Sequence, residues 1–335
     1  MQNFTTKSRK NPDLPRKSGD GEGDEGRVTQ PAGVEGVALL TLGYTVLVVL
    51  FGAWVRISGS GAGCGQHWPT CNGELVHLPT RIKTVVELTH RVTAGATLVP
   101  AIYLAVLAWK STPPGHRLRT ATLLGVALTI AEDLIGAALV LFGLVDKNIS
   151  ATRAVVMPLH LVFTYGLVAT LALAALWAHE RESAPAASRG ETPSLTLPLL
   201  AALGVLVVAA TGAVTALGDT VYPPLAHTLM ARVAEDHGES AHFLQRFRGV
   251  HPVLALLTAV GVAWVAGSLW DARDRVLRLA SRAVLGLVLV QLVAGVSNVL
   301  LSAPGWLQIV HLGLSLGLWI SLVTLIGATR RYRPA

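Results

Sequence analysis

Eight apolar segments, each about 20 residues long, dominate this chain of 335 residues. A bilayer core about 30 Å thick needs roughly 20 mostly apolar residues for one helical crossing, so each segment is long enough to span it. The segments begin near Val34, Ile82, Leu118, Ala154, Leu195, Val250, Val276 and Leu307. The pattern predicts an all-α integral membrane protein with eight transmembrane helices.

Charged residues make up only 14% of the chain, whereas a soluble domain has about 25%. The net charge of +7 does not indicate nucleic-acid binding, because the Lys and Arg residues lie in short gaps between apolar segments. In such gaps they set orientation, since cytoplasmic loops carry an excess of positive charge. Basic residues follow every even-numbered segment. We therefore expect a multi-pass cell-membrane protein with both termini cytoplasmic and the loop after the first segment outside.

The segments form two groups of four that resemble each other. GAWVRISGSG begins at Gly52 and GAVTALGDT at Gly212, while EDLIGAALV contains Gly136 and QLVAGVSNV contains Gly295. These offsets of 160 and 159 residues predict a parallel internal repeat of two pseudo-symmetric four-helix bundles, although Gly-rich helices can also resemble each other by chance. The expected organisation is a disordered cytoplasmic tail over 1–33, an N-terminal bundle over 34–179, a cytoplasmic linker over 180–194, a C-terminal bundle over 195–329 and a cytoplasmic tail over 330–335.

Four of the eleven histidines lie inside apolar segments, one on each even-numbered segment. They are His90, His160, His251 and His311, each about 8–12 Å inside the predicted outer surface at 1.5 Å per residue. A single intramembrane histidine often only joins helices by hydrogen bonds. Four at one depth favour axial ligation of haem iron, with one haem between His90 and His160 and another between His251 and His311. Zinc fits less well, because two imidazoles would leave it underfilled.

The two halves differ next to these histidines. Glu87 lies three residues before His90 and shares its helix face, whereas Arg248 holds the corresponding place before His251. We expect Glu87 to take a proton or to stabilise a developing cation at a reacting porphyrin substituent. The alternative is a hydrogen bond to polar loop residues or an ion pair with Arg91.

Three arginines near the predicted outer interface, Arg91, Arg246 and Arg248, are candidates for pairing with haem propionates. They could equally be interface anchors whose charged ends reach toward water.

The chain has two cysteines, Cys64 and Cys71, both in the Gly-rich stretch GSGAGCGQHWPTC. An outside location is oxidising, which favours a disulfide between them. A zinc site is the alternative, because His67 and His77 lie beside the two thiols and complete a set of four ligands.

The run GAWVRISGSGAGCGQHWPTCNGEL, followed by ELTHR, resembles the haem A synthase family, and the resemblance covers roughly 34–329. It implies an enzyme that oxidises one methyl group of haem O to a formyl group, by successive hydroxylations, for the assembly of cytochrome oxidase. Haem O would then be the substrate and haem A the product. The membrane prenyltransferase haem O synthase would be a partner.

By the same resemblance, the N-terminal bundle is the catalytic half, in which His90, His160 and Glu87 line the substrate haem. The C-terminal bundle would hold a resident haem b between His251 and His311. The two cysteines would stabilise their loop or exchange electrons with the substrate haem. Some bacterial relatives have a second cysteine pair in the C-terminal half, and this chain has none there.

Two other classes of protein could also contain these histidines. A membrane cytochrome with two b haems would use all four as ligands and would only transfer electrons, but it does not explain why Glu87 lies beside one pair alone. A transporter would use them as proton relays, and it predicts unwound helices near the centre of the membrane.

Overall fold

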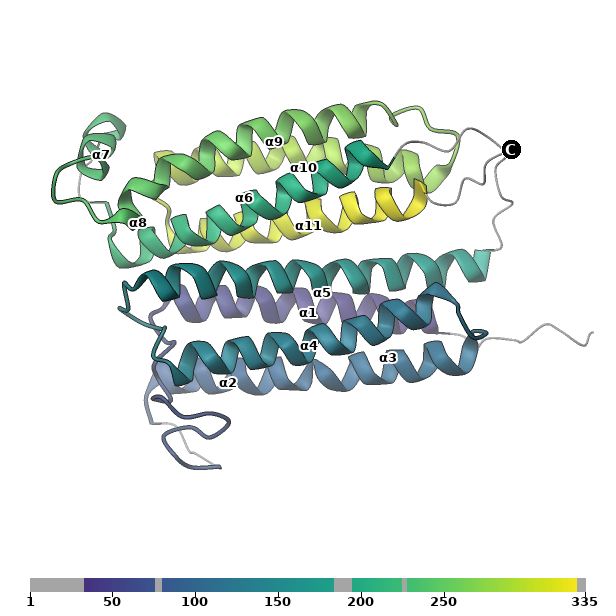
Figure 1. Cartoon of the computed structure of the whole chain (residues 1–335), viewed down its shortest axis with the longest axis horizontal. Coiled ribbons are helices and arrows are strands. Elements are labelled where there is room, and N and C mark those ends of the chain that lie inside the picture. Colours follow the sequence, from purple (N-terminus) through teal and green to yellow (C-terminus); the bar gives the residue numbers. More distant parts are fainter. Residues whose placement is uncertain (1–32, 76–79, 184–194, 225–227, 330–335) are drawn as a thin grey trace, which may run out of the picture.

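The computed structural model describes residues 33–75, 80–183, 195–224 and 228–329. Eight helical segments in these ranges are long and apolar enough to cross a membrane (Figure 1). They confirm the predicted number of spans and fit a multi-pass membrane protein. The predicted tails over 1–33 and 330–335 and most of the linker over 180–194 lie outside the described residues.

The spans run between two ends of the molecule (Figure 1). We call the end with the α1–α2 loop and α7 the disulfide end, and the opposite one the terminal end. The N-terminal half contains α1 (Val34–Ile57), α2 (Ile82–Ala96), α3 (Leu98–Ser111), α4 (Arg117–Leu141) and α5 (Ala151–Ser183). The C-terminal half contains α6 (Thr196–Val221), α7 (Leu229–Asp236), α8 (Phe243–Arg246), a 3-10 turn (Phe247–Gly249), α9 (Val250–Gly267), α10 (Arg275–Leu300) and α11 (Gly305–Thr329).

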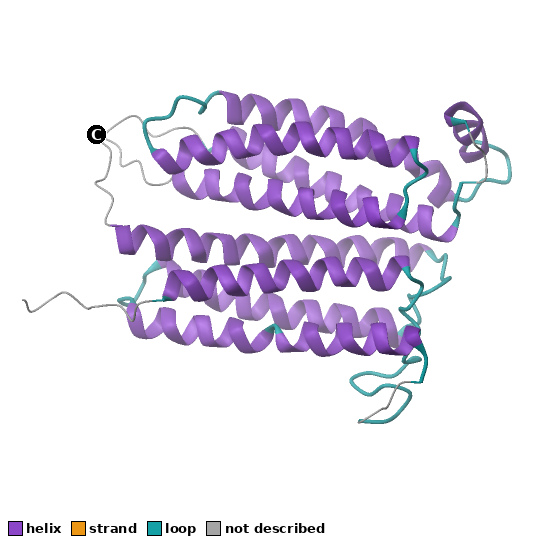
Figure 2. Cartoon of the chain, turned by 180° about the vertical axis from the view of Figure 1, so that it is seen from behind, coloured by secondary structure: helices purple, strands orange, loops and turns teal. Residues whose placement is uncertain are grey.

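Two groups of helices pack side by side (Figures 1 and 2). α1 to α5 pack against one another in one group, and α6, α9, α10 and α11 form the other. α5 contacts both α6 and α11 across the boundary, and it is the most buried of the spans. The grouping agrees with the two predicted bundles, and the pseudo-symmetry between them stays a prediction.

Tyr165 on α5 and Trp319 on α11 join the two groups. The Tyr165 side chain is fully buried, and its hydroxyl lies 2.6 Å from Oγ of Ser315. The indole N–H of Trp319 donates to the carbonyl oxygen of Tyr165 at 2.7 Å. Because lipid tails are as apolar as the helices, close packing and such hydrogen bonds hold helices together in a membrane.

The second span has a break that the sequence pattern did not predict. α2 ends at Ala96 and α3 begins at Leu98, with Thr97 between them and Pro100 in the first turn of α3. Proline has no N–H group and is tolerated in a first helical turn but not in a helix interior. The break lies next to this proline, although Pro158 lies inside α5 without interrupting it, so packing around Pro100 also contributes.

Helix ends at the disulfide end use left-handed glycines. Gly59 follows α1 with φ +61° and Gly143 follows α4 with φ +62°, a conformation that costs glycine little. At the terminal end, the Asp274 side chain caps α10 by accepting the N–H of Leu277 at 2.9 Å. Gly59 and Gly143 thus fix where the α1–α2 and α4–α5 loops begin. Both loops therefore lie over the same end of the N-terminal bundle.

Candidate functional site

One cavity of about 1050 Å³ extends through both groups of helices, and all four intramembrane histidines line it. His90 and His160 belong to the N-terminal group, and His251 and His311 to the C-terminal group. Each lies within the first three turns of its span, counted from the disulfide end. The structure therefore brings the four predicted residues to a similar depth around one space.

Each histidine ring packs against a glycine on a neighbouring helix. A Cβ atom at Gly52 would lie 3.0 Å from Cε1 of His90, and one at Gly212 would lie 2.9 Å from Cε1 of His251. Either contact is closer than side chains normally allow, so an alanine there would displace the imidazole. The glycines thus make the space in which these two rings lie.

The other two histidines also lie beside a glycine, with a tight fit at His311 and an ordinary van der Waals distance at His160. A Cβ atom at Gly136 would lie 3.9 Å from Cε1 of His160, and one at Gly295 would lie 3.3 Å from Cε1 of His311. All four glycines are the landmarks from which the repeat was predicted. The sequence similarity between the halves therefore coincides with matching histidine–glycine contacts.

His251 and His311 face each other in the C-terminal half. Their ring centres are 6.4 Å apart and their planes lie at 84°. Two imidazoles that bind one metal ion through bonds of about 2 Å have ring centres about 6 Å apart. The observed distance between the ring centres is therefore compatible with one metal ion between His251 and His311. Nδ1 of His251 lies 3.1 Å from the carbonyl oxygen of Val208, a contact that leaves Nε2 as the metal-binding nitrogen. Nε2 of His311 lies 3.2 Å from the amide nitrogen of Gln291.

In the N-terminal half, the two histidines have different surroundings. Nδ1 of His160 lies 2.7 Å from Oε2 of Glu132, and the Thr164 hydroxyl donates to the same oxygen at 3.1 Å. His90 contacts Phe51 edge to face at 5.7 Å, and its buried Nδ1 has no hydrogen-bond partner among the described residues. An unsatisfied buried nitrogen costs free energy, and Nδ1 of His160 is also without a hydrogen bond of normal geometry in the described part of the molecule, despite its short distance to Glu132.

The donor set fits haem better than zinc. Within the described ranges, no group of three or more His, Cys, Asp or Glu side chains could hold a metal ion. Two imidazoles complete the coordination of haem iron, because the porphyrin brings four nitrogens of its own, but they underfill zinc. The partnerless Nδ1 atoms of His90 and His311 and the glycine-lined ring pockets are compatible with rings that adjust around a bound haem.

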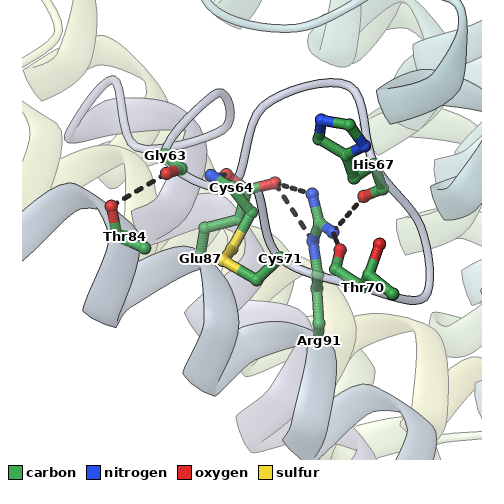
Figure 3. The surroundings of a disulfide bond; sticks show 8 residues. All are labelled: Gly63, Cys64, His67, Thr70, Cys71, Thr84, Glu87 and Arg91. Atoms are coloured by element: carbon green, nitrogen blue, oxygen red, sulfur yellow. Dashed lines mark hydrogen bonds and ion pairs between the residues drawn. A yellow bond between two sulfur atoms is a disulfide. The ribbon is translucent and has the colours of Figure 1, made fainter. Parts of the chain in front are cut away.

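Cys64 and Cys71 form a disulfide in the α1–α2 loop (Figure 3). In this form neither sulfur is a thiolate ligand for zinc, and His77 of the alternative zinc set lies outside the described residues. The loop is attached to α2, because the Thr84 hydroxyl donates to the carbonyl oxygen of Gly63 at 2.8 Å.

Glu87 is buried between this loop and the cavity (Figure 3). Its Oε2 accepts the backbone N–H of Cys64 at 2.8 Å, and its Oε1 is ion-paired with Arg91. Arg91 also donates to the carbonyl oxygens of His67 at 2.5 Å and Thr70 at 3.0 Å. The carboxylate thus lines the cavity, as a reacting group must. It also makes both contacts that were considered as the alternative, a hydrogen bond to the loop and an ion pair with Arg91.

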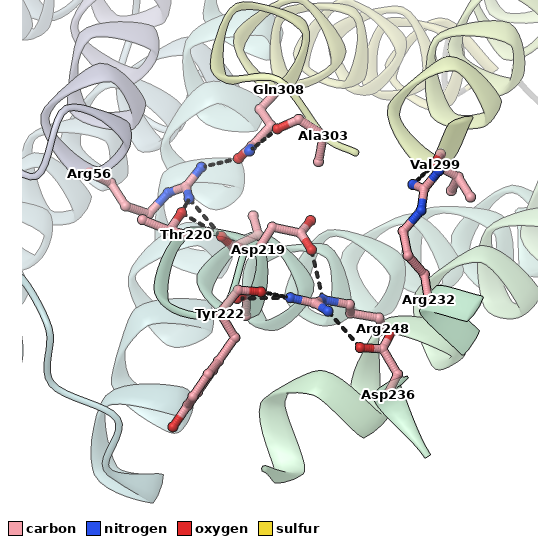
Figure 4. Close-up of polar contacts among 12 residues, drawn as sticks. Arg56, Asp219, Thr220, Tyr222, Arg232, Asp236, Arg248, Val299, Ala303 and Gln308 are labelled. Atoms are coloured by element: carbon pink, nitrogen blue, oxygen red, sulfur yellow. Dashed lines mark hydrogen bonds and ion pairs between the residues drawn. The ribbon is translucent and has the colours of Figure 1, made fainter. Parts of the chain in front are cut away.

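Of the other two arginines selected from the sequence, Arg248 lines the cavity and Arg246 does not. Arg248 lies between two carboxylates, 2.8 Å from Oδ1 of Asp219 and 2.6 Å from Oδ1 of Asp236 (Figure 4). Arg246 donates to carbonyl oxygens in the loop between α7 and α8. Arg248 is therefore the better placed for a ligand in the cavity.

Three further arginines line the cavity near its disulfide end. They are Arg56, Arg153 and Arg232. From the sequence, Arg56 and Arg232 counted only among the basic residues of the loops between spans. Arg56 donates to the carbonyl oxygen of Ala216 at 2.7 Å and to Oε1 of Gln308 at 2.8 Å (Figure 4). These hydrogen-bond partners are neutral, and the nearby carboxylate of Asp219 offsets part of the buried charge.

Arg153 and Arg232 are buried in a similar way. Arg153 donates to the carbonyl oxygen of Asp146 at 2.6 Å, and Arg232 to that of Val299 at 2.6 Å. The Nε atom of each is buried without a hydrogen-bond partner in the described part of the chain. Buried guanidinium groups with free N–H donors match carboxylate ligands such as haem propionates.

Glu132 was also missed, although the sequence contained a signal for it. The pair Glu132 and Asp133 interrupts an apolar segment, and ionisable residues inside a membrane are usually functional. The motif EDLIG was used only as a landmark of the repeat, so the acidic pair was not assigned a role.

Comparisons with known proteins place these features in context. The family described as COX15-CtaA, cytochrome oxidase assembly protein, matches residues 36–323. Proteins named protoheme IX farnesyltransferase from two strains of Thermus thermophilus are 41% identical over 293 residues, which cover 87% of this chain and 47% of theirs. Proteins named heme A synthase from Bacillus cereus and Bacillus anthracis are 36% identical over 110 residues, or 33% of this chain and 35% of theirs. The chain thus spans about half the length, or less, of these curated relatives.

Proposed function

The chain belongs to the COX15-CtaA family of cytochrome oxidase assembly proteins, and on this premise we propose that it is a haem A synthase. It would oxidise one methyl group of haem O to the formyl group of haem A. The observation that carries this proposal is one cavity with two histidine pairs, in which the buried carboxylate of Glu87 lies one helical turn before His90 where the other half has Arg248. The similarity to proteins named heme A synthase supports it.

The two halves would have different tasks. His90 and His160 would bind the iron of the substrate haem O in the N-terminal half. His251 and His311 would hold a resident haem b, and the Val208 carbonyl would keep Nε2 of His251 free for the metal. Bound haem b would supply a one-electron redox centre close to the substrate.

The residues around the substrate would bind it and handle its protons. Each of two successive hydroxylations of the methyl carbon would add one oxygen atom from water and release two protons and two electrons, and the electrons would pass to an external acceptor. The resulting geminal diol would lose water to give the aldehyde. Glu87 would accept a proton released at that carbon. The N–H of Cys64 and the guanidinium of Arg91 hold the Glu87 carboxylate at the cavity wall, and so would fix its position relative to the substrate.

The arginines would bind the propionate groups of the two haems. Arg248 lines the cavity, as do Arg153 and Arg232 with their partnerless Nε atoms. Arg91 also lines it and is engaged by Glu87, while Arg246 would reach a propionate only by leaving the α7–α8 loop. A charge-assisted hydrogen bond to a propionate would compensate Arg153 and Arg232, whereas Arg248 and Arg91 are already paired with carboxylates of the chain.

Haem O is a farnesylated haem, so a prenyltransferase must supply it. We propose haem O synthase as that partner. The proteins named protoheme IX farnesyltransferase support a link, because a region similar to this chain takes up 47% of their length and leaves the rest for another activity. A farnesyl group is apolar, which suits delivery within the membrane.

The proposed orientation follows from the loop charges and the disulfide. Cys64 and Cys71 would face the oxidising side, because disulfides persist outside the cytosol. The terminal end would then face the cytoplasm, in agreement with the basic residues after the even-numbered spans.

The test is the haem composition of membranes. A host that lacks haem A would express this chain together with haem O synthase, and the haems would be extracted and chromatographed. Haem A or its alcohol intermediate is expected. Haem b with unconverted haem O, from a folded chain supplied with an electron acceptor, would instead support an electron-transferring cytochrome with two b haems. Haem O formed without haem O synthase would indicate a farnesyltransferase.

A further inference from the structure

Two polar side chains in equivalent positions contact the histidines of α5 and α11. Oε2 of Glu132 on α4 lies 2.7 Å from Nδ1 of His160, and the amide nitrogen of Gln291 on α10 lies 3.2 Å from Nε2 of His311. Glu132 and Gln291 are 159 residues apart, the same offset as the glycines that contact these two histidines. The repeat therefore places a carboxylate beside one histidine and an amide beside the other.

The burial of Glu132 points to a role beyond packing. Its side chain is 13% exposed, on an apolar span, and its partners in the described structure are His160 and the Thr164 hydroxyl. Its second oxygen, Oε1, is buried with no hydrogen-bond partner among the described residues. A carboxylate with so few donors inside a membrane segment is costly, and such residues are retained for function.

We propose that Glu132 is a positioning residue: its Oε2, 2.7 Å from Nδ1 of His160, would accept the Nδ1–H once the ring turns to present Nε2 to the iron of the haem in the N-terminal half. A carboxylate acceptor makes a histidine a more electron-rich ligand than a neutral partner does. Gln291 is neutral and contacts the opposite ring nitrogen, Nε2 of His311, so it does not act on His311 as Glu132 acts on His160. The inference rests on the proposed role of these histidines as haem ligands.

The consequence is a difference in reduction potential between the two haem sites. A more electron-rich ligand stabilises the ferric state, so the N-terminal site should have the lower potential. Oxidation of a substrate in that half needs electrons to leave it, and a higher potential at the C-terminal haem favours their transfer in that direction. The difference between glutamate at position 132 and glutamine at position 291 would thus help to give the two halves different tasks.

The test uses the purified full chain loaded with haem b and titrated electrochemically, with optical and low-temperature EPR spectra. Glu132→Gln should raise the potential of one of two haems and shift its low-spin g values, and leave the other haem unchanged. Glu132→Asp, which keeps the charge but shortens the side chain, should shift the same haem by less than Glu132→Gln does. The signal that disappears in His251→Ala identifies the C-terminal haem.

Asp133→Asn is the matched control. Asp133 is the next residue on α4 and also lines the cavity, and it is close enough to interact with the charge of His160, but no hydrogen bond or ion pair joins the two in the described structure. It should leave the g values unchanged. Equal g shifts in Asp133→Asn and Glu132→Gln, or unmoved potentials in Glu132→Gln with both haems bound, would overturn the inference.

The outcomes separate this inference from the proposed function. A wild-type chain that binds no haem contradicts both. A wild-type chain with two haems whose potentials do not respond to these exchanges contradicts the inference alone. If Glu132→Gln does not fold, Glu132→Asp still decides, because it keeps the carboxylate charge and should give a smaller shift of the same haem.

Discussion

The backbone N–H of Cys64 donates a hydrogen bond of 2.8 Å to Oε2 of Glu87 (Figure 3). This bond connects the disulfide loop directly to the buried carboxylate at the cavity wall. Arg91 strengthens the connection, because it pairs with Glu87 and donates to the carbonyl oxygens of His67 and Thr70 within the same loop. The conformation of the loop and the position of the carboxylate are therefore coupled.

Glu87→Gln should abolish haem A formation while haem b stays bound. The amide has the same shape but cannot accept a proton, and general-base catalysis typically contributes about 10²- to 10⁴-fold. We expect a fall of at least ~100-fold in the rate of haem A formation, measured by chromatography of extracted haems. A variant that forms haem A at the wild-type rate contradicts the role assigned to Glu87, and an unchanged haem b spectrum is the control for folding.

Replacing both cysteines by serine should loosen the loop without unfolding the helices. A disulfide closing so short a loop contributes ~2–3 kcal/mol in the chain-entropy estimate. We expect faster proteolysis in the α1–α2 loop and lower activity, because Glu87 loses a fixed donor at residue 64. Intact-mass measurement after alkylation checks the premise: the wild-type chain should take up two labels only after reduction. Labelling without reductant would mean that the bond is absent.

Gly212→Ala should reduce the haem b content of the purified protein. The new Cβ would lie 2.9 Å from Cε1 of His251 and would displace a proposed axial ligand. Gly261→Ala is the matched control, because a Cβ at that position of α9 meets no atom within 4 Å. The haem to protein ratio measures the effect. Equal ratios in the two variants would show that the glycine does not position the histidine.

Much of this architecture could be predicted because membrane spans follow from hydropathy. The eight spans and the positions of His90, His160, His251 and His311 along them depend only on apolar length and spacing. The break at Thr97 was not predictable in the same way. It depends on how the chain around Pro100 packs, which no periodicity reports.

The polar part of the site was predicted less completely. Glu87 was found because it shares a helix face with His90, a relationship within one helix. The contact of Glu132 with His160 joins two helices, and the sequence does not state which faces of α4 and α5 meet. Arg153 was missed for the same reason, since its place at the cavity depends on the path of the α4–α5 loop.

The orientation in the membrane makes a separate prediction. Single cysteines introduced at the exposed loop positions Glu239→Cys and Asp271→Cys lie at opposite ends of the molecule. In intact cells, a membrane-impermeant maleimide should label the cysteine at 239, at the disulfide end, and spare the one at 271. Both should react after the cells are opened. The reverse pattern in intact cells would place the disulfide loop inside.

The most direct test of the division between the halves is the haem content of two histidine variants, purified as full chains from cells that also express haem O synthase. We predict that His251→Ala loses haem b, and that His90→Ala keeps haem b but loses the farnesylated haem and its products. Loss of haem b from His90→Ala with retention in His251→Ala would contradict the assignment of the catalytic half and the haem b half.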